Sequence, residues 1–213
     1  MISKNHGKLP IMKIQYTKTD YLAAYSQHLK MLNAQDRFTR FGYSAGDYNV
    51  DQLILNILYH PEDHHLFMAQ VDDDTVGFTH LAKCANGWEL AVSVASEHQG
   101  QGIANQLMIH TINWARTHGV DSLFMHCIRN NQLIQHLAAK HGLHVIERSG
   151  ADVTAKMQLP PPTATDYTVD FVREQQDLLD QMLALHQQWL ANFNPLTRRQ
   201  RNDISYRYSS SSH

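Results

Sequence analysis

The sequence predicts an α/β (α+β) protein, and three observations carry this prediction. Segments in which apolar and polar residues alternate, as in strands, are interleaved with segments whose apolar residues recur at helical spacing. A turn containing Gly100 and Gly102 joins one such strand to one such helix. The length of 213 residues suits one domain with a sizeable core and a short appendage.

The expected strands and helices alternate along the chain. Asp20 is expected to cap the first helix, which ends near Leu32. The second helix ends near Pro61, because proline cannot continue a helix. An acidic turn at residues 72–74 joins the two strands of a hairpin. The expected strands are 13–16, 66–71, 75–83, 89–94, 122–127, 144–148 and 155–159, and the expected helices are 20–32, 50–59, 103–117 and 131–141.

The glycine turn is the strongest functional signal in the sequence. Gly100 and Gly102 allow a tight turn and the close approach of a ligand to the backbone. The free N–H groups of the helix that follows suit a phosphate or pyrophosphate. A Walker loop is excluded because Ile103 and Ala104 stand where it needs Lys and Ser or Thr. A Rossmann turn is excluded because Gln106 stands at its third glycine-like position.

The same turn carries a family resemblance. Gln99-x-x-Gly102-x-Ala104 resembles Arg/Gln-x-x-Gly-x-Gly/Ala, the acetyl-CoA-binding motif of the GNAT superfamily of N-acetyltransferases. The match holds at every defined position of the motif.

Further blocks extend the resemblance over residues 65–159. Residues 88–94 and 122–127 look like the fourth and fifth strands of the family, and 131–143 is similar to its Asn-x-x-Met-x-x-Leu-x-x-x-x-Gly-Phe helix and turn. The Asp-Arg-x-x-Arg-Phe segment at 36–41 resembles bacterial stand-alone GNAT proteins of undefined acceptor. The resemblance implies a GNAT fold, with a mixed central β-sheet of about six or seven strands, flanked by helices, and with strands four and five splayed apart.

The resemblance also implies a site for acetyl-CoA as co-substrate. In the family the pantetheine arm enters between strands four and five, and the glycine turn wraps the pyrophosphate. Asn131 resembles the asparagine whose amide contacts the cofactor, and it can also cap the following helix. The implied cofactor-binding residues are Val92, Ser93, Val94, Gln99, Gly100, Gln101, Gly102, Ile103, Ala104, Asn105 and Asn131.

The implied reaction moves the acetyl group to a primary amine by direct attack in a ternary complex. Glu89 is the leading candidate for the general base, because a carboxylate in a cleft can accept a proton from an ammonium group or an ordered water. A solvated or ion-paired strand-edge glutamate is the alternative. The tyrosine that many family members carry is replaced by Ala138, so His126 or Cys127 is left as a substitute acid. A packed strand histidine and a small buried thiol are the alternative interpretations.

The acceptor is a small-molecule or protein amine that the sequence leaves open: a protein lysine, a polyamine, an aminoglycoside or another amine. Aromatic side chains of the early helices are expected either to line its cleft or to lie in the core; they are Tyr21, Tyr25, Phe38, Phe41 and Tyr43. A non-catalytic acyl-CoA-binding sensor or interaction module is the alternative function. The missing tyrosine favours that alternative, and the retained Glu89 argues against it.

Composition narrows the possible partners. The net charge of −2 argues against a nucleic-acid-binding surface. No run of about 20 apolar residues and no signal peptide is present, and two cysteines fit a reducing compartment, so a cytoplasmic location without membrane association is expected. His60, His64 and His65 are expected in a surface loop, with no metal bound, because no metal-ligand motif accompanies them.

A run of three prolines at 160–162 marks a domain boundary. The expected parts are a GNAT acetyltransferase domain at 1–160, a proline-linked C-terminal helix at 161–197 and a flexible tail at 198–213. Apolar residues recur along the helix at near-helical spacing, at Phe171, Leu178, Met182, Leu185 and Trp189. This stripe predicts a helix packed back on the domain, a dimer contact within a homodimer, or a wall of the substrate cleft.

Overall fold

The computed structural model describes most of the chain, namely residues 12–17, 21–72, 74–85, 87–150 and 152–193. The chain divides into two compact units, residues 1–167 and residues 168–213. The expected cap Asp20 and the expected tail at 198–213 lie outside the described residues. None of the helices among these residues combines the length and apolar character needed to cross a membrane.

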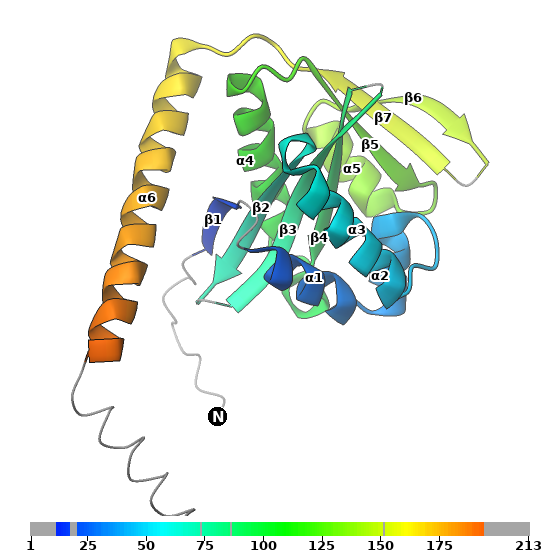
Figure 1. Ribbon diagram of the computed structural model, residues 1–213. Coiled ribbons are helices and arrows are strands. Elements are labelled where there is room, and N and C mark those ends of the chain that lie inside the picture. Colours follow the sequence, from blue (N-terminus) through cyan, green and yellow to red (C-terminus); the bar gives the residue numbers. More distant parts are fainter. Residues whose placement is uncertain (1–11, 18–20, 73, 86, 151, 194–213) are drawn as a thin grey trace, which may run out of the picture. The chain divides into compact units, whose positions relative to one another are not determined.

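A seven-stranded mixed sheet forms the centre of the first unit (Figure 1). Its order is β1-β2-β3-β4-β5-β7-β6, and β4 with β5 is its parallel pair. The predicted mixed sheet of about six or seven strands is therefore confirmed. The strands are β1 Met12–Thr17, β2 His64–Val71, β3 Asp74–Cys84, β4 Gly87–Val94, β5 Ser122–Ile128, β6 His144–Ser149 and β7 Asp152–Gln158.

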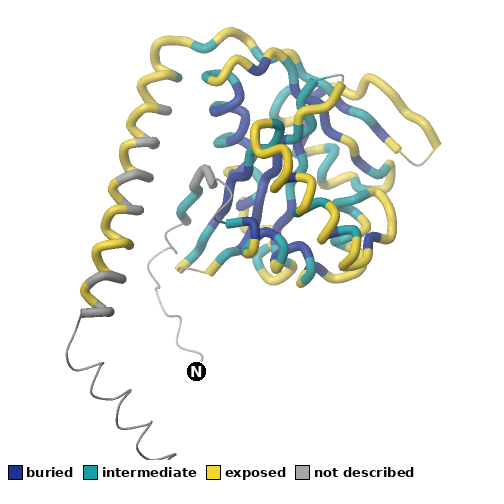
Figure 2. Tube along the Cα trace, in the orientation of Figure 1, coloured by how far each residue is buried: buried dark blue, intermediate teal, exposed yellow. Residues whose placement is uncertain are grey.

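Helices flank the sheet on both faces, as predicted. Side chains of α1 and α3 share one core cluster with Leu66, Met68 and Phe78 of the sheet. Side chains of α4 and the end of α5 share a second cluster with strands β2 to β5. Figure 2 shows the central strands buried between these layers. The helices are α1 Leu22–Met31, α2 Ala34–Phe41, α3 Asp47–Tyr59, α4 Ile103–Thr117, α5 Gln132–Lys140 and α6 Ala164–Phe193, with 3-10 turns η2 Pro61–Asp63 and η3 Ser96–His98.

Strands β4 and β5 pair over only two residue pairs. Trp88 pairs with Leu123 and Glu89 with Phe124, whereas β4 continues to Val94 and β5 to Ile128. On its other side β4 pairs with β3 along its whole length. The β5-facing edge of β4 beyond Glu89 is therefore open, as the predicted splay requires.

Two local predictions need correction. The segment before Gly42 forms helix α2, which the periodicity did not indicate; Asn33 caps it by accepting from the Asp36 amide at 2.8 Å. His64 and His65 begin strand β2 and are half-buried, so the predicted surface loop is wrong for them. Of the three histidines only His60 is exposed, between α3 and η2.

The start of α6 belongs to the first unit. Asp166 accepts hydrogen bonds from the Thr163 amide and hydroxyl, both at 2.7 Å, and pairs with Arg116 of α4 at 2.9 Å. The Thr163 hydrogen bonds, followed by Arg116, lower the pKa of Asp166. Further along α6, apolar side chains are exposed, among them Phe171, Met182 and Leu185.

Gly77 of β3 permits the close packing that holds β4 in place. A Cβ at this position would lie 2.9 Å from the Ser93 carbonyl oxygen and 3.2 Å from a Val94 methyl group. Gly77→Ala is expected to lower the free energy of unfolding by about 1–3 kcal/mol, because β4 must shift. Urea unfolding measures this loss, and Gly46→Ala, whose Cβ would meet nothing closer than 3.8 Å, serves as control. Equal losses in both variants would contradict the packing argument.

Candidate active site

Two cavities lie on either side of the place where β4 and β5 part. The turn cavity, of about 630 Å³, is lined by the glycine turn, the start of α4, the end of β4 and one side of α5. The histidine cavity, of about 700 Å³, is lined by α2, α3 and the sheet, including His60, His64, His80 and His126. Three residues line both: Thr39, Arg40 and Ile128. The two cavities therefore share a wall.

The turn cavity contains all of the predicted cofactor-binding residues except Gln101. They are Val92, Ser93, Val94, Gln99, Gly100, Gly102, Ile103, Ala104, Asn105 and Asn131. Asn131 caps α5 by accepting from the Ile134 amide at 3.1 Å, as predicted. The Gln101 side chain turns away and donates to the Glu97 carbonyl at 3.2 Å.

The start of α4 has the properties of an anion site. Gly102 is its N-cap in a left-handed conformation, with φ of 85°, so no side chain satisfies the first N–H groups. Its first turn contains no acidic residue. A Cβ on Gly100 or Gly102 would have no protein atom within 4 Å, which leaves room for a ligand against the backbone. The residues present thus fit a pyrophosphate.

Asp36 of α2 anchors the loop that enters this turn. Its carboxylate accepts hydrogen bonds from Ser96 at 2.6 Å, Asn33 at 2.8 Å and Gln99 at 2.9 Å. Gln99 also donates to the Val94 carbonyl at 3.2 Å. The Gln99 side chain therefore holds the loop against α2 and β4 at the wall of the turn cavity.

His28 of α1 supports β4 from the opposite face of the sheet to α4. Its Nε2 lies 2.9 Å from the Ser93 hydroxyl, and its ring packs 5.3 Å from that of Phe78. Burial, followed by the nearby Arg40, lowers the pKa of His28 to about 4. The imidazole is therefore neutral at pH 7.

This shift predicts a pH-dependent stability. Burial also lowers the pKa of His65 to about 4. The unfolded chain binds more protons than the folded chain between pH 4 and 6.5, so stability is complete above about pH 6.5 and is lost as pH falls toward 4. His28 alone should contribute a loss of about 2 kcal/mol between pH 7 and 5. Urea unfolding at both pH values measures it.

A variant pair isolates the contribution of His28. His28→Asn should reduce the slope of stability against pH while leaving the contribution of His65, whereas His144→Asn, at an exposed position of β6, should leave the slope unchanged. An unaltered slope in His28→Asn would contradict the assignment.

The histidine cavity holds both predicted catalytic residues. Glu89 of β4 is half-buried and lines it beside Ala91. His126 of β5 also lines it; its side chain is exposed, with Nδ1 3.1 Å from the Thr154 hydroxyl. Cys127 is buried, and burial raises the pKa of its thiol, so it is a poor nucleophile.

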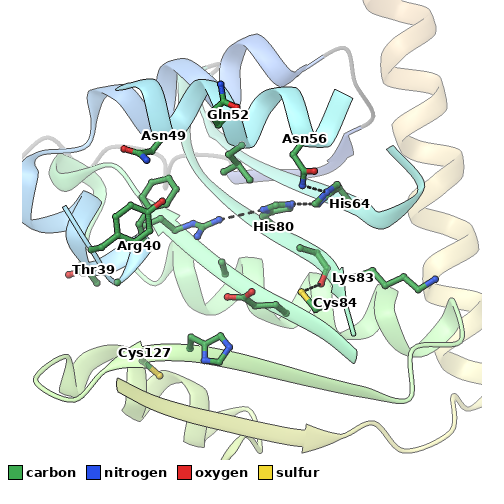
Figure 3. Close-up of a pocket in the computed structure, with 18 of the residues that line it drawn as sticks. Thr39, Arg40, Asn49, Gln52, Asn56, His64, His80, Lys83, Cys84 and Cys127 are labelled. Atoms are coloured by element: carbon green, nitrogen blue, oxygen red, sulfur yellow. Dashed lines mark hydrogen bonds between the residues drawn. The ribbon is translucent and has the colours of Figure 1, made fainter. Parts of the chain in front are cut away.

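A chain of polar contacts crosses the histidine cavity (Figure 3). Asn56 lies 3.1 Å from His64, His64 lies 3.0 Å from His80, and His80 lies 3.4 Å from Arg40. The Arg40 guanidinium also donates to the Tyr25 hydroxyl at 2.9 Å. The chain joins α3, β2, β3 and α2 across the cavity wall.

Arg40 determines which group donates and which accepts in each contact of this polar series. A guanidinium only donates, so His80 Nδ1 accepts and His80 Nε2 carries the proton. His80 then donates to His64 Nδ1, and the proton of His64 lies on Nε2. The Asn56 atom placed 3.1 Å from this Nε2 is the amide nitrogen Nδ2, so the donor order assigned from Arg40 requires the Asn56 amide to be flipped to present its oxygen. Burial lowers the pKa of His64, and burial with Arg40 lowers that of His80 well below its usual range. Both imidazoles are neutral at pH 7.

The aromatic residues of the early helices divide between core and cavities. Tyr25 is fully buried and Tyr21 packs against the same cluster. Phe41 and Tyr43 line the histidine cavity, and Phe38 lines the turn cavity. Ala138, at the position of the family tyrosine, is buried in the core and offers no polar atom.

His60, Glu62 and Asp63 lie close enough to one another to be considered as metal ligands. Their ligand atoms all lie within 4.8 Å of one another near the rim of the histidine cavity. His60 and Glu62 are exposed, and Asp63 lies 3.8 Å from Lys83. Exposed acidic groups of this kind are common without an ion, so the cluster carries no metal assignment.

The fold and the turn cavity together define an acyltransferase. The family described as acetyltransferase (GNAT) matches residues 29–143, which is more than half of the chain. This chain therefore belongs to the acetyltransferase (GNAT) family, whose members are N-acetyltransferases that use acetyl-CoA. No curated protein sequence matches it.

Solved structures share the fold at low identity. PaiA N-acetyltransferase from Thermoplasma acidophilum, in complex with coenzyme A, is 18% identical with a TM-score of 0.56, over 70% of this chain and 99% of that chain. The GNAT domain of S. lividans PAT is 15% identical with a TM-score of 0.59, over 70% and 90%. Spermidine N-acetyltransferase from Vibrio cholerae, in complex with CoA and spermine, is 15% identical with a TM-score of 0.53, over 70% and 95%.

Proposed function

We propose that this protein transfers the acetyl group of acetyl-CoA to a primary amine by direct attack in a ternary complex. The observation that carries the proposal is the pair of cavities that meet at Thr39, Arg40 and Ile128, where β4 and β5 part. A donor in the turn cavity and an amine in the histidine cavity would meet at that wall. No covalent intermediate is then needed, and the buried Cys127 thiol supports this.

The turn cavity residues would hold the donor mainly through backbone groups. The amides of Ile103, Ala104 and Asn105 would bind the pyrophosphate, and Asn131 would contact the cofactor through its side-chain amide. The open edge of β4, at Val92, Ser93 and Val94, would pair with the pantetheine arm like an added strand. Acetyl-CoA supplies a thioester as the acetyl donor.

Glu89 would act as general base. It would accept, directly or through water, the proton that the ammonium group must lose before its nitrogen attacks the thioester carbonyl. The nitrogen attacks the thioester carbonyl and forms a tetrahedral oxyanion, which a backbone N–H of the open β4 edge would stabilise. As this intermediate collapses, the C–S bond breaks and the nitrogen loses its second proton. His126, whose exposed side chain lines the same cavity, would protonate the leaving thiolate and take up that second nitrogen proton in exchange.

Initial rates measured with both substrates varied test this sequence of events. Direct attack predicts lines that intersect in double-reciprocal plots, and no acetylated enzyme in its mass spectrum. Parallel lines with acetylated Cys127 would contradict it. Binding of acetyl-CoA without turnover of any amine would instead support the alternative, an acyl-CoA-binding sensor or interaction module.

A cytoplasmic location and a homodimer also stay predictions. The apolar side chains exposed on α6 motivate the homodimer, and sedimentation equilibrium of the full chain measures it.

A further inference from the structure

Arg40 occupies the position at which the two cavities meet. It lies in the last turn of α2 and lines both the turn cavity and the histidine cavity. Its guanidinium is held in place by the Tyr25 hydroxyl at 2.9 Å and by the Phe41 ring, whose centroid lies 5.2 Å away. A residue with a fixed positive charge therefore lies at the wall that the two cavities share.

The charge of Arg40 has no carboxylate partner among the described residues. Arg37, one turn earlier in α2, pairs with Asp47 at 2.7 Å, whereas no carboxylate in the described part of the chain lies within ion-pair distance of Arg40. Its recorded hydrogen bonds, to Tyr25 and His80, both use one terminal nitrogen. The other guanidinium nitrogens can donate to a ligand.

Apart from Arg40, the charged groups that line the histidine cavity are mostly carboxylates. Lys83 pairs with Asp63 at 3.8 Å, which leaves Glu89 and Asp152 as the lining carboxylates without a cation partner in the described residues. The cavity thus offers carboxylates to an ammonium group and one unmatched guanidinium at the shared wall. This arrangement is complementary to a zwitterion.

We infer that the acceptor carries an anionic group beside its amine, and that Arg40 binds this group; an α-amino acid has this chemistry. The inference rests on the proposed function, since the amine must reach the shared wall to meet the donor. An anion bound there by Arg40 lies close to that amine, as the carboxylate of an α-amino acid does. A guanidinium binds a carboxylate through two parallel hydrogen bonds, and it binds a phosphonate equally well.

Arg40 also selects against polycations. A polyamine brings further ammonium groups toward the shared wall, and like charges in a partly desolvated site repel. An acceptor with an adjacent anion replaces this repulsion by a salt bridge. Polyamines and lysine side chains are therefore the poorer acceptors.

The test compares kcat/KM for acceptors with and without an anionic group beside the amine. The panel contains α-amino acids, the matching amino acid amides, 1-aminoalkylphosphonates, polyamines and lysine peptides, each with saturating acetyl-CoA. The wild type should prefer the acids over their amides by about 10- to 100-fold. Arg40→Gln should remove this preference by slowing the acids alone, and Arg40→Lys should retain part of it. Arg148→Gln, at an exposed position of β6, is the matched control.

The outcomes separate the inference from the function on which it rests. If phosphonates are preferred over carboxylates, Arg40 still binds the anion of the acceptor, but that anion is a phosphonate and not a carboxylate. Equal rates for acids and amides, or an Arg40→Gln variant that slows both alike or weakens acetyl-CoA binding instead, would overturn the role of Arg40 and leave the acetyltransferase intact. Failure of every amine, with acetyl-CoA bound, would overturn both proposals.

Discussion

Glu89→Gln is expected to lower kcat by roughly 100-fold or more while leaving the affinity for acetyl-CoA unchanged, as general bases contribute about that much. Glu89 lines the histidine cavity and does not line the turn cavity, so its loss should affect proton removal from the amine and not donor binding. The amide is nearly isosteric with the carboxylate and cannot accept the proton. Steady-state kinetics and acetyl-CoA calorimetry on the same preparation measure the two effects.

The pH profile provides the sharper test of this base. The pH dependence of kcat should differ between the wild type and Glu89→Gln, because only the wild type has the base. Glu147→Gln, an exposed glutamate of β6 that lines neither cavity, is the matched control and should keep wild-type kinetics. An unchanged rate in Glu89→Gln across the pH range would remove Glu89 from the mechanism.

Ala104→Glu is expected to weaken acetyl-CoA binding by about 100-fold or more. Ala104 lies in the first turn of α4 and lines the turn cavity, so a carboxylate there occupies the anion site and repels the pyrophosphate. The same charge three residues earlier, in Gln101→Glu, should have little effect, because the Gln101 side chain is exposed and does not line the cavity.

Calorimetric titration of both variants, with their thermal midpoints measured alongside, distinguishes a blocked site from a damaged fold. Ala104→Glu should melt cooperatively and fail to bind, whereas Gln101→Glu should bind like the wild type. Equal affinities in the two variants would place acetyl-CoA elsewhere.

The turn cavity could be predicted because the residues that form the glycine turn are close together in the sequence. A strand, two glycines and a helix follow one another from Gly87 to Thr117, and the positive φ of Gly102 explains why glycine stands there. The Gln101 side chain donates to the Glu97 carbonyl, a contact that motif spacing does not indicate, and its predicted part in cofactor binding stays a prediction.

The sequence contains a local signal for helix α2, but the helix is too short for its periodicity to be recognised. Asn33 and Asp36 have the spacing of a capping pair, and Gly42 ends the helix in a left-handed conformation. With only eight residues, the helix shows too few turns for hydrophobic periodicity to be recognised.

The histidine cavity could not be predicted because its residues come together only through strand register and helix packing. His64 and His80 lie 16 positions apart and meet because β2 pairs antiparallel with β3, where Leu66 lies opposite His80. Arg40 was visible in the sequence as part of a motif, but its unmatched charge depends on which carboxylates the fold brings near it.

We propose that acetyl-CoA bound in the turn cavity acetylates an amine bound in the histidine cavity. This transfer is tested by measuring CoA release and N-acetylated product simultaneously across the amine panel. Each CoA released should be matched by one acetylated amine, and Glu89→Gln and Ala104→Glu should both lower the two signals together and to the same extent. Stoichiometric acetyl-CoA binding with no acetylated amine from any member of the panel would contradict it.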